Sequence, residues 1–151
     1  MPYKKPSSHS IRKGRVSLRN QIYLVTFVTE GRKQYFADFH CAHLMVKSLK
    51  KSTHAETLAF VVMPDHVHWL IQLLDETSLS QVLHSVKSVS GHQLNYHLKR
   101  KGRFWQPGFH DHALRREDAI KDAARYIIAN PLRAGLVASV RDYSHWDAIW
   151  V

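Results

Sequence analysis

The stretch VVMPDHVHWLI, residues 61–71, decides the fold and the candidate chemistry of this chain. Apolar residues on both sides of its Pro-Asp pair predict two antiparallel strands joined by a tight turn. Side chains alternate between the faces of a strand, so His66 and His68 lie on one face and Val67 on the other. The two Cα atoms are about 6.5 Å apart, a spacing at which two imidazoles can bind one metal ion. A strand with a polar outer face would show the same alternation, so the metal interpretation needs support from elsewhere.

The composition predicts a single domain with a polyanionic partner. The chain has 151 residues, 44% of them hydrophobic, which suffices for one core. Lys and Arg outnumber Asp and Glu by 22 to 12, and the pI of about 9.9 indicates attraction to nucleic acid. No apolar run approaches the ~20 residues of a membrane span, and the basic N-terminus lacks the apolar segment of a signal peptide. The single cysteine, Cys41, excludes an intrachain disulfide, so we expect a cytoplasmic protein.

Hydrophobic periodicity predicts an α+β fold. We expect strands at 21–29, 57–63, 66–74 and 109–114, and helices at 40–51, 78–100 and 116–130. The order β-α-β-β-α-β, followed by one more helix, predicts a ferredoxin-like antiparallel sheet with both long helices on one face and an additional C-terminal helix. Ser78 with Gln81 three residues later predicts a capping box at the start of the longest helix. Many unrelated functions use this fold, so the fold alone decides none of them.

The chain divides into three expected segments. Residues 1–20 form a basic arm, which is either a solvated tail or a segment that becomes ordered on nucleic acid. Residues 21–137 form the folded domain. Residues 138–151 are rich in aromatic side chains, and we expect this C-terminal tail to pack back onto the domain rather than to stack on bases.

The helix predicted at 116–130 carries a second candidate group. Its apolar stripe consists of Ile120, Ala123, Ala124, Ile127 and Ile128, a full match to the amphipathic pattern. At about 100° per residue, Tyr126 lies far from the centre of this stripe and is not an ordinary core tyrosine. Asn130 follows one turn later on nearly the same face. Because Pro131 disfavours helical conformation in the residue before it, we expect the helix to end at Asn130.

A rival histidine pair occurs in the last predicted strand. The sequence FHDHAL, residues 109–114, places His110 and His112 on one face and Asp111 on the other. This pair has the same spacing as His66 and His68. We interpret it as part of a solvent-facing or DNA-facing strand, or as support for the metal ligands.

Together these features resemble the single-tyrosine HUH endonucleases, which are named for two histidines flanking a hydrophobe. More narrowly, the chain is similar to the REP-associated tyrosine transposases. The matching stretches cover nearly the whole chain: residues 23–29 followed by Arg32, the MPDHVH of 63–68, the WQPGFHD of 105–111, and the YIIANPLRAGLV of 126–137. The last two stretches make the resemblance specific.

The resemblance implies a complete set of roles. Tyr126 would attack a phosphate of single-stranded DNA, leaving a 5′-phosphotyrosine and a free 3′-hydroxyl. His66, His68 and Asn130 would hold a divalent metal, Mg²⁺ or Mn²⁺. The substrate would be a palindromic hairpin element with a short single-stranded flank. The protein would be associated with the nucleoid and would act as a monomer or a homodimer.

The implied chemistry agrees with the residue types. A phenol has a pKa near 10 and needs activation, and a metal on the scissile phosphate would stabilise the developing charge. Imidazole and amide ligands without cysteine suit Mg²⁺ or Mn²⁺ rather than structural zinc. A covalent intermediate keeps the phosphodiester energy, so no nucleotide cofactor is needed, and the chain has no GxxxxGK loop.

Basic residues are the candidates for DNA contact. Collectively they predict an affinity that falls steeply with salt. They are Lys13, Arg15, Arg32, Lys87, Arg100, Lys101, Arg103, Arg115, Arg116 and Arg133.

Two alternatives follow from the same residues. A histidine-triad nucleotide hydrolase would need a third histidine where Leu70 stands, which argues against that class. A non-catalytic ferredoxin-like module that binds single-stranded nucleic acid would need exposed aromatics on its central strands. Tyr23 and Phe27 share a strand face and could serve, although core packing explains Phe27 as well.

Overall fold

A computed structural model of the chain describes residues 20–148, and residues 1–19 and 149–151 lie outside the described part. Most of the expected basic arm, including Lys13 and Arg15, therefore falls outside it. The strands are β1 (Ile22–Val28), β2 (Ala55–Met63), β3 (His66–Leu73), β4 (His110–Leu114) and β5 (Trp146–Ala148). The helices are α2 (Phe39–Lys50), α3 (Leu79–Leu98) and α4 (Glu117–Arg133), with short 3₁₀ turns at Glu30–Arg32, Tyr35–Ala37 and Val140–Asp142.

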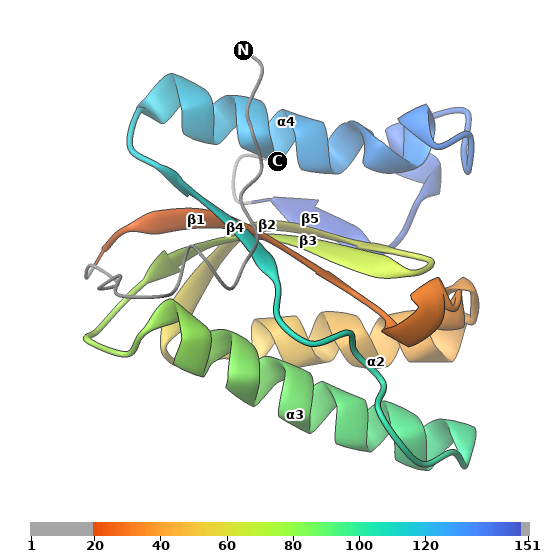
Figure 1. Cartoon of the computed structure of the whole chain (residues 1–151). Coiled ribbons are helices and arrows are strands. Elements are labelled where there is room, and N and C mark those ends of the chain that lie inside the picture. Colours follow the sequence, from red (N-terminus) through yellow and green to blue (C-terminus); the bar gives the residue numbers. More distant parts are fainter. Residues whose placement is uncertain (1–19, 149–151) are drawn as a thin grey trace.

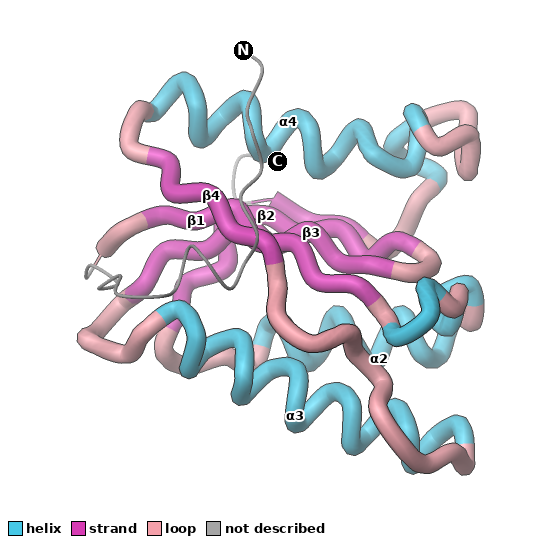
Figure 2. The backbone as a smooth tube through the Cα atoms, viewed as in Figure 1, coloured by secondary structure: helices cyan, strands magenta, loops and turns pink. Residues whose placement is uncertain are grey.

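The strands form one antiparallel sheet in the order β4-β1-β3-β2-β5. The order of the first four strands, β4-β1-β3-β2, is the one that a βαββαβ chain forms when both helices pack on the same face of the sheet. The ferredoxin-like fold predicted from the sequence is therefore confirmed. Figure 1 shows α2 and α3 together on one face of the sheet and α4 alone on the other. Figure 2 shows the resulting three layers, with the sheet between α4 on one side and α2 and α3 on the other.

Strand alternation divides the apolar side chains into two cores. On β3, Val67, Trp69 and Ile71 are buried in the core beneath α2 and α3. Leu70 belongs to the smaller core under α4, which also holds Ile127. Since side chains of alternate residues share a face, His66 and His68 lie on the α4 side of β3, as the sequence predicts.

The long helix α3 begins as predicted. The Ser78 side chain accepts from the Gln81 backbone N–H, and the Gln81 side chain accepts from the Ser78 backbone N–H. Gly91, in the middle of α3, lies against the loop that precedes β4, where an added Cβ would lie 3.5 Å from Phe104 Cβ and 3.6 Å from Trp105 Cδ1. An added Cβ would make ordinary van der Waals contact with both residues, so the loop packs directly on the helix at this position.

The predicted end of the tyrosine-bearing helix is wrong. Helix α4 runs through Pro131 to Arg133 rather than stopping at Asn130. Pro131 removes one helical N–H, but its ring is buried and the next bond, from Ala134 N–H to the Asn130 carbonyl, forms at 2.9 Å. The helix ends at Arg133 with Ala134 as its C-cap, and Gly135 follows with a φ of 75°. The N–H groups of residues 135 and 136 donate back to carbonyls of the last turn.

The aromatic C-terminal segment contacts the sheet within the described residues. Strand β5 pairs with β2, and the Tyr143 hydroxyl donates to the Val62 carbonyl at 2.6 Å. The Trp146 indole N–H donates to the Val140 carbonyl at 2.8 Å, which holds β5 against the 3₁₀ turn that precedes it. The β5 pairing and the Tyr143 bond cover the β2 edge of the sheet, which would otherwise present unpaired backbone groups.

Candidate active site

The two histidines of β3 lie side by side on the face covered by α4. Their ring centroids are 4.8 Å apart and the ring planes are nearly perpendicular, at 84°. His68 is buried, and the side chain of His66 retains 18% exposure. The pair therefore forms a compact imidazole face at the end of the sheet, next to the turn at Pro64 and Asp65.

Each imidazole is oriented by a neighbouring oxygen. Nδ1 of His68 lies 2.8 Å from the hydroxyl of Thr26, its partner across the β1–β3 ladder. Nδ1 of His66 lies 2.6 Å from Oδ1 of Asp65. Proteins commonly fix a metal-binding histidine in this way, with one ring nitrogen hydrogen-bonded so that the other faces the metal.

Asp65 connects one of these histidines to a cation. Its second carboxylate oxygen, Oδ2, accepts from Nε of Arg32 at 3.1 Å. Burial acts to raise the pKa of the Asp65 carboxyl, but the hydrogen bonds and charges of His66 and Arg32 outweigh it and lower the pKa. The carboxylate is thus ionised at neutral pH and holds both neighbours.

Tyr126 reaches this face from α4. The residue is 43% exposed, and its ring lies edge-on to His68 with centroids 5.7 Å apart. The guanidinium carbon of Arg133 lies 4.1 Å from the Tyr126 ring centroid on the same helix. The space between β3 and α4 therefore holds a chain of ring contacts, from the two imidazoles through the phenol to the guanidinium.

Asn130 lies one turn beyond the tyrosine but turns toward its own helix. Among the described residues, its amide nitrogen donates to the Tyr126 carbonyl at 3.2 Å. With the amide nitrogen in this bond, the amide oxygen is the atom that Asn130 could offer to a metal. The donor set of two oriented imidazoles and one adjacent amide fits a hard divalent cation with water and phosphate in its other positions.

The rival histidines of β4 lie on the same face as the first pair, but further away. The register places His110 opposite Thr26, which is itself opposite His68, so β1 separates the two histidine strands. The backbones of the two histidine strands therefore lie two strand spacings, about 9.6 Å, apart. Within the described part of the chain, Nδ1 of His110 is buried and has no hydrogen-bond partner.

The basic candidates within the described residues fall into three groups. At the site itself are Arg32, bound to Asp65, and Arg133, stacked on Tyr126. Arg115 and Arg116 are exposed at the start of α4, where Arg116 pairs with Asp118 at 3.0 Å.

The remaining basic candidates lie at α3 and the loop after it. Lys87 donates to the carbonyls of Gln106 and Gly108 at 2.7 and 2.6 Å, so part of its role is to hold that loop. Arg100 donates to Asn95, and Arg103 lies 3.7 Å from Glu30. Lys101 is exposed.

Two members of the site, Thr26 and Asp65, are not predicted by the sequence patterns. These patterns assign Asp65 only to a turn and Thr26 only to a strand. Thr26 becomes visible only through the cross-strand register, which no single-sequence pattern provides. The adjacency of Asp65 to His66 was a signal available in the sequence.

A different group of metal-ligating types occurs away from this face. Ligand atoms of Asp38, Cys41 and His97, at facing ends of α2 and α3, all lie within 4.8 Å of one another. Cys41 is fully buried, and burial raises the pKa of its thiol to about 11. These helices cover the opposite face of the sheet from α4 (Figure 1), so this group is separate from His66 and His68.

The family model of IS200-like transposases matches residues 17–130, and the chain belongs to that family. Two relatives of the chain are, more particularly, named as REP-associated tyrosine transposases. A putative one from Haemophilus influenzae is 26% identical over 137 residues, covering 84% of this chain and 72% of that protein. The one from Escherichia coli K12 is 30% identical over 102 residues, covering 67% of this chain and 58% of that protein.

Solved structures show the same fold. A REP-associated tyrosine transposase bound to a REP hairpin superposes with a TM-score of 0.71 at 24% identity, covering 87% of this chain and 79% of that one. A putative transposase from Deinococcus radiodurans gives a TM-score of 0.55 at 23% identity, covering 77% of this chain and 95% of that one. Among the described residues, no helix combines the length and apolar character needed to cross a membrane.

Proposed function

We propose that this transposase is a metal-dependent single-stranded DNA endonuclease and strand transferase that acts on hairpin repeat elements through Tyr126. One observation carries the proposal: the Tyr126 ring lies 5.7 Å from that of His68, beside a second histidine whose Nδ1 is likewise anchored. The family membership and the hairpin in the solved relative support the same class of substrate.

In this mechanism the Tyr126 oxygen attacks the scissile phosphorus. The phenol gives up its proton as its oxygen bonds to phosphorus, the bond from phosphorus to the 3′-oxygen breaks, and the 3′-oxygen takes up one proton, so bonds and protons balance. The product is a 5′-phosphotyrosine, and reversal with another 3′-hydroxyl would join strands. The positive charge of Arg133 beside the ring would favour both the phenolate and the incoming phosphate.

His66, His68 and the amide oxygen of Asn130 would hold the divalent cation, Mg²⁺ or Mn²⁺. When bound, the cation would polarise the scissile phosphate and orient it for in-line attack. Thr26 and Asp65 would keep the two imidazoles in their ligating orientation. Energy conserved in the phosphotyrosine removes the need for a nucleotide cofactor.

A denaturing gel tests the proposal. Labelled hairpin DNA with a single-stranded flank is incubated with the protein and Mg²⁺ or Mn²⁺, and covalent protein–DNA adducts are resolved. We expect an adduct that Tyr126→Phe abolishes while hairpin binding survives, and whose formation His66→Ala or His68→Ala reduces far more than binding. Hairpin binding with no adduct under any divalent metal would instead identify a non-catalytic binding module.

A further inference from the structure

The start of α2 brings a carboxylate and a sulfur together. Asp38 is the N-cap of this helix, and its Oδ1 accepts from the backbone N–H groups of His40 and Cys41 at 2.8 and 3.2 Å. These bonds position the carboxylate over the first turn and use only one of its two oxygens. Cys41 follows three positions after Asp38, which is an interval that paired zinc ligands commonly have along a chain.

His97 brings an imidazole to the same place from the end of α3. Figure 1 shows α2 and α3 side by side, with the start of α2 and the end of α3 at the same end of the sheet. The ligand atoms of Asp38, Cys41 and His97 all lie within 4.8 Å of one another. Ligand atoms around a tetrahedral zinc ion are separated by about 3.3–3.6 Å, so a closure of about 1 Å completes the geometry. Asp38 and His97 are exposed, which allows this adjustment.

The surroundings of the Cys41 thiol are those of a ligand rather than of a core side chain. The residue is fully buried, and within residues 20–148 its thiol makes neither a disulfide nor a hydrogen bond. A buried cysteine ordinarily packs as a small apolar group, whereas this one lies against a carboxylate and an imidazole. Burial raises the pKa of the thiol to about 11, so an ion that binds here has to displace its proton, as thiolate-binding metals do.

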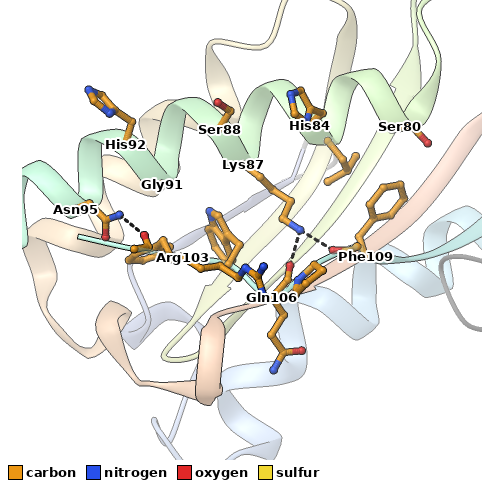
Figure 3. Close-up of a pocket in the computed structure, with 16 residues that line it drawn as sticks. Ser80, His84, Lys87, Ser88, Gly91, His92, Asn95, Arg103, Gln106 and Phe109 are labelled. Carbon is orange, nitrogen blue, oxygen red and sulfur yellow. Dashed lines mark hydrogen bonds between the residues drawn. The ribbon is translucent and has the colours of Figure 1, made fainter. Parts of the chain in front are cut away.

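The end of α3 that carries His97 is anchored to the chain that follows it. The Asn95 amide donates to the Gly102 carbonyl at 2.8 Å, as Figure 3 shows, and the Arg100 backbone N–H donates to the Asn95 carbonyl at 2.9 Å. The cavity drawn in Figure 3, about 670 Å³ in volume, is lined by residues of α3 only as far as Asn95. His97 therefore projects from a backbone that is already ordered, which lowers the entropic cost of binding a ligand.

The donor set selects a different class of metal from the one expected at the candidate active site. Thiolate and imidazole together favour Zn²⁺ and similar transition-metal ions, whereas Mg²⁺ prefers oxygen ligands. Three protein ligands leave one tetrahedral position for water, and the exposed His40 ring lies beside the group, 6.1 Å from that of His97. Because α2 and α3 cover the face of the sheet opposite α4, an ion here lies away from Tyr126.

We propose that Asp38, Cys41 and His97 form a binding site for Zn²⁺ or a chemically similar transition-metal ion, which joins the start of α2 to the end of α3. The site is distinct from that of the divalent cation bound by His66 and His68, and the proposal does not depend on the reaction of Tyr126.

The site also adjoins the turn that precedes the histidine strand. The Asp38 backbone N–H donates to the Tyr35 carbonyl at 3.3 Å, and the Phe36 backbone N–H donates to the Pro64 carbonyl at 3.0 Å. An ion bound by Asp38 would therefore restrain segment 35–38 and, through it, the turn before His66. Its contribution is to stability, because a ligand that binds only the folded state shifts the unfolding equilibrium.

Cobalt spectroscopy tests the site, because Cys41 is the only cysteine of the chain. The full-length protein is freed of metal with a chelator and titrated with Co²⁺, whose bond to a thiolate gives a charge-transfer absorption band in the near ultraviolet. Imidazole and carboxylate ligands do not produce this band, so Co²⁺ bound by His66 and His68 does not contribute to it. We expect the band in the wild type, and we expect Zn²⁺, but not an excess of Mg²⁺, to abolish it.

Three substitutions at exposed positions provide the variants. Asp38→Asn keeps the helix cap, since Asn is as good an N-cap as Asp, but removes the carboxylate. His97→Gln removes the imidazole, and His92→Gln changes an exposed histidine of the same helix outside the group, which makes it the matched control. We expect Asp38→Asn and His97→Gln to weaken Co²⁺ binding, followed by the band, about tenfold or more, and His92→Gln to leave it unchanged.

Lack of the band in the wild type with Co²⁺ in excess, or equal Co²⁺ affinities of His97→Gln and His92→Gln, would overturn the proposed site. Thermal unfolding tests the join between the helices: Zn²⁺ should raise the midpoint of His92→Gln by about 5 °C more than that of His97→Gln. Equal shifts would show that the ion does not hold α2 to α3. None of these measurements uses DNA, so their outcome is independent of the adduct assay.

Discussion

The hydroxyl of Thr26 on β1 lies 2.8 Å from Nδ1 of His68 on β3, directly across the ladder. Both residues are buried, so this contact fixes the imidazole plane more firmly than a solvent-exposed bond would. Since second-sphere partners of metal-binding histidines typically contribute 10–100-fold to metal affinity or activity, we expect Thr26→Val to lower metal-dependent adduct formation by about that factor. Thr26→Ser, which keeps the hydroxyl, should retain most of the activity. Hairpin binding measured without metal should be unchanged in both variants.

Asp65 allows a similar test on the other histidine. Asp65→Ala removes the acceptor for His66 and the partner of Arg32, and we expect metal affinity measured by isothermal titration to fall about tenfold or more. Arg32→Gln removes only the cation and should have a smaller effect. If Arg32→Gln matches Asp65→Ala, the carboxylate acts through the arginine and not through the imidazole.

The pH dependence of stability follows from the lowered pKa of Asp65. A carboxyl whose pKa is lower in the folded state stabilises the protein at pH values above its unfolded pKa, near 3.8. This contribution to stability is lost as the pH falls through the lowered pKa of the folded state. The stability difference between the wild type and Asp65→Asn should therefore narrow as the pH is lowered from about 5 toward 3. Urea unfolding across that range measures it, and a constant difference would contradict the assignment.

Arg133 should contribute to the reaction of Tyr126. Its guanidinium carbon lies 4.1 Å from the centroid of the Tyr126 ring, a cation–π contact worth about 0.5–1 kcal/mol at an exposed site. We expect Arg133→Gln to slow adduct formation about three- to tenfold and to reduce the salt slope of DNA affinity by about one, as loss of one phosphate contact would. Arg125→Gln, on the same helix but paired with Asp122, serves as the control and should leave the rate of adduct formation unchanged.

Lys87 is predicted to act largely on stability. Its ammonium donates to the Gln106 and Gly108 carbonyls, and hydrogen bonds from charged groups contribute about 1.5–3 kcal/mol each in mutational series. Lys87→Met should lower the free energy of unfolding by about 1–3 kcal/mol, measured in urea. A variant of unchanged stability with weaker DNA binding would make Lys87 a DNA contact instead.

Tyr143 holds the C-terminal segment against β2. Tyr143→Phe removes its bond to the Val62 carbonyl and should cost about 1–2 kcal/mol of unfolding free energy. Burial raises the pKa of Tyr143 to about 12, so the neutral phenol is favoured in the folded state. Its contribution is complete below the unfolded value of 10 and disappears as the pH rises toward 12, which alkaline unfolding of wild type and variant would reveal.

Much of the fold could be predicted because local patterns agreed with one another. The alternation in 66–73 and the stripe of α4 each define a buried face, and the capping box at Ser78 marks a helix start. The end of α4 was mispredicted because a proline penalty of a few kcal/mol is a local term. Burial of Pro131 and the left-handed turn at Gly135 outweigh it in the folded chain.

The sequence by itself determined which side chains share a face: His66 with His68 on a strand, and Tyr126 away from the apolar stripe of its helix. These are consequences of a fixed period along the backbone, which one chain segment specifies alone. Only the tertiary structure decided that Tyr126 approaches His68, that Thr26 and Asp65 orient the imidazoles, and that β1 separates His110 from His68. Such relationships depend on strand register and on how helices dock on a sheet, and both result from packing between segments distant in the sequence.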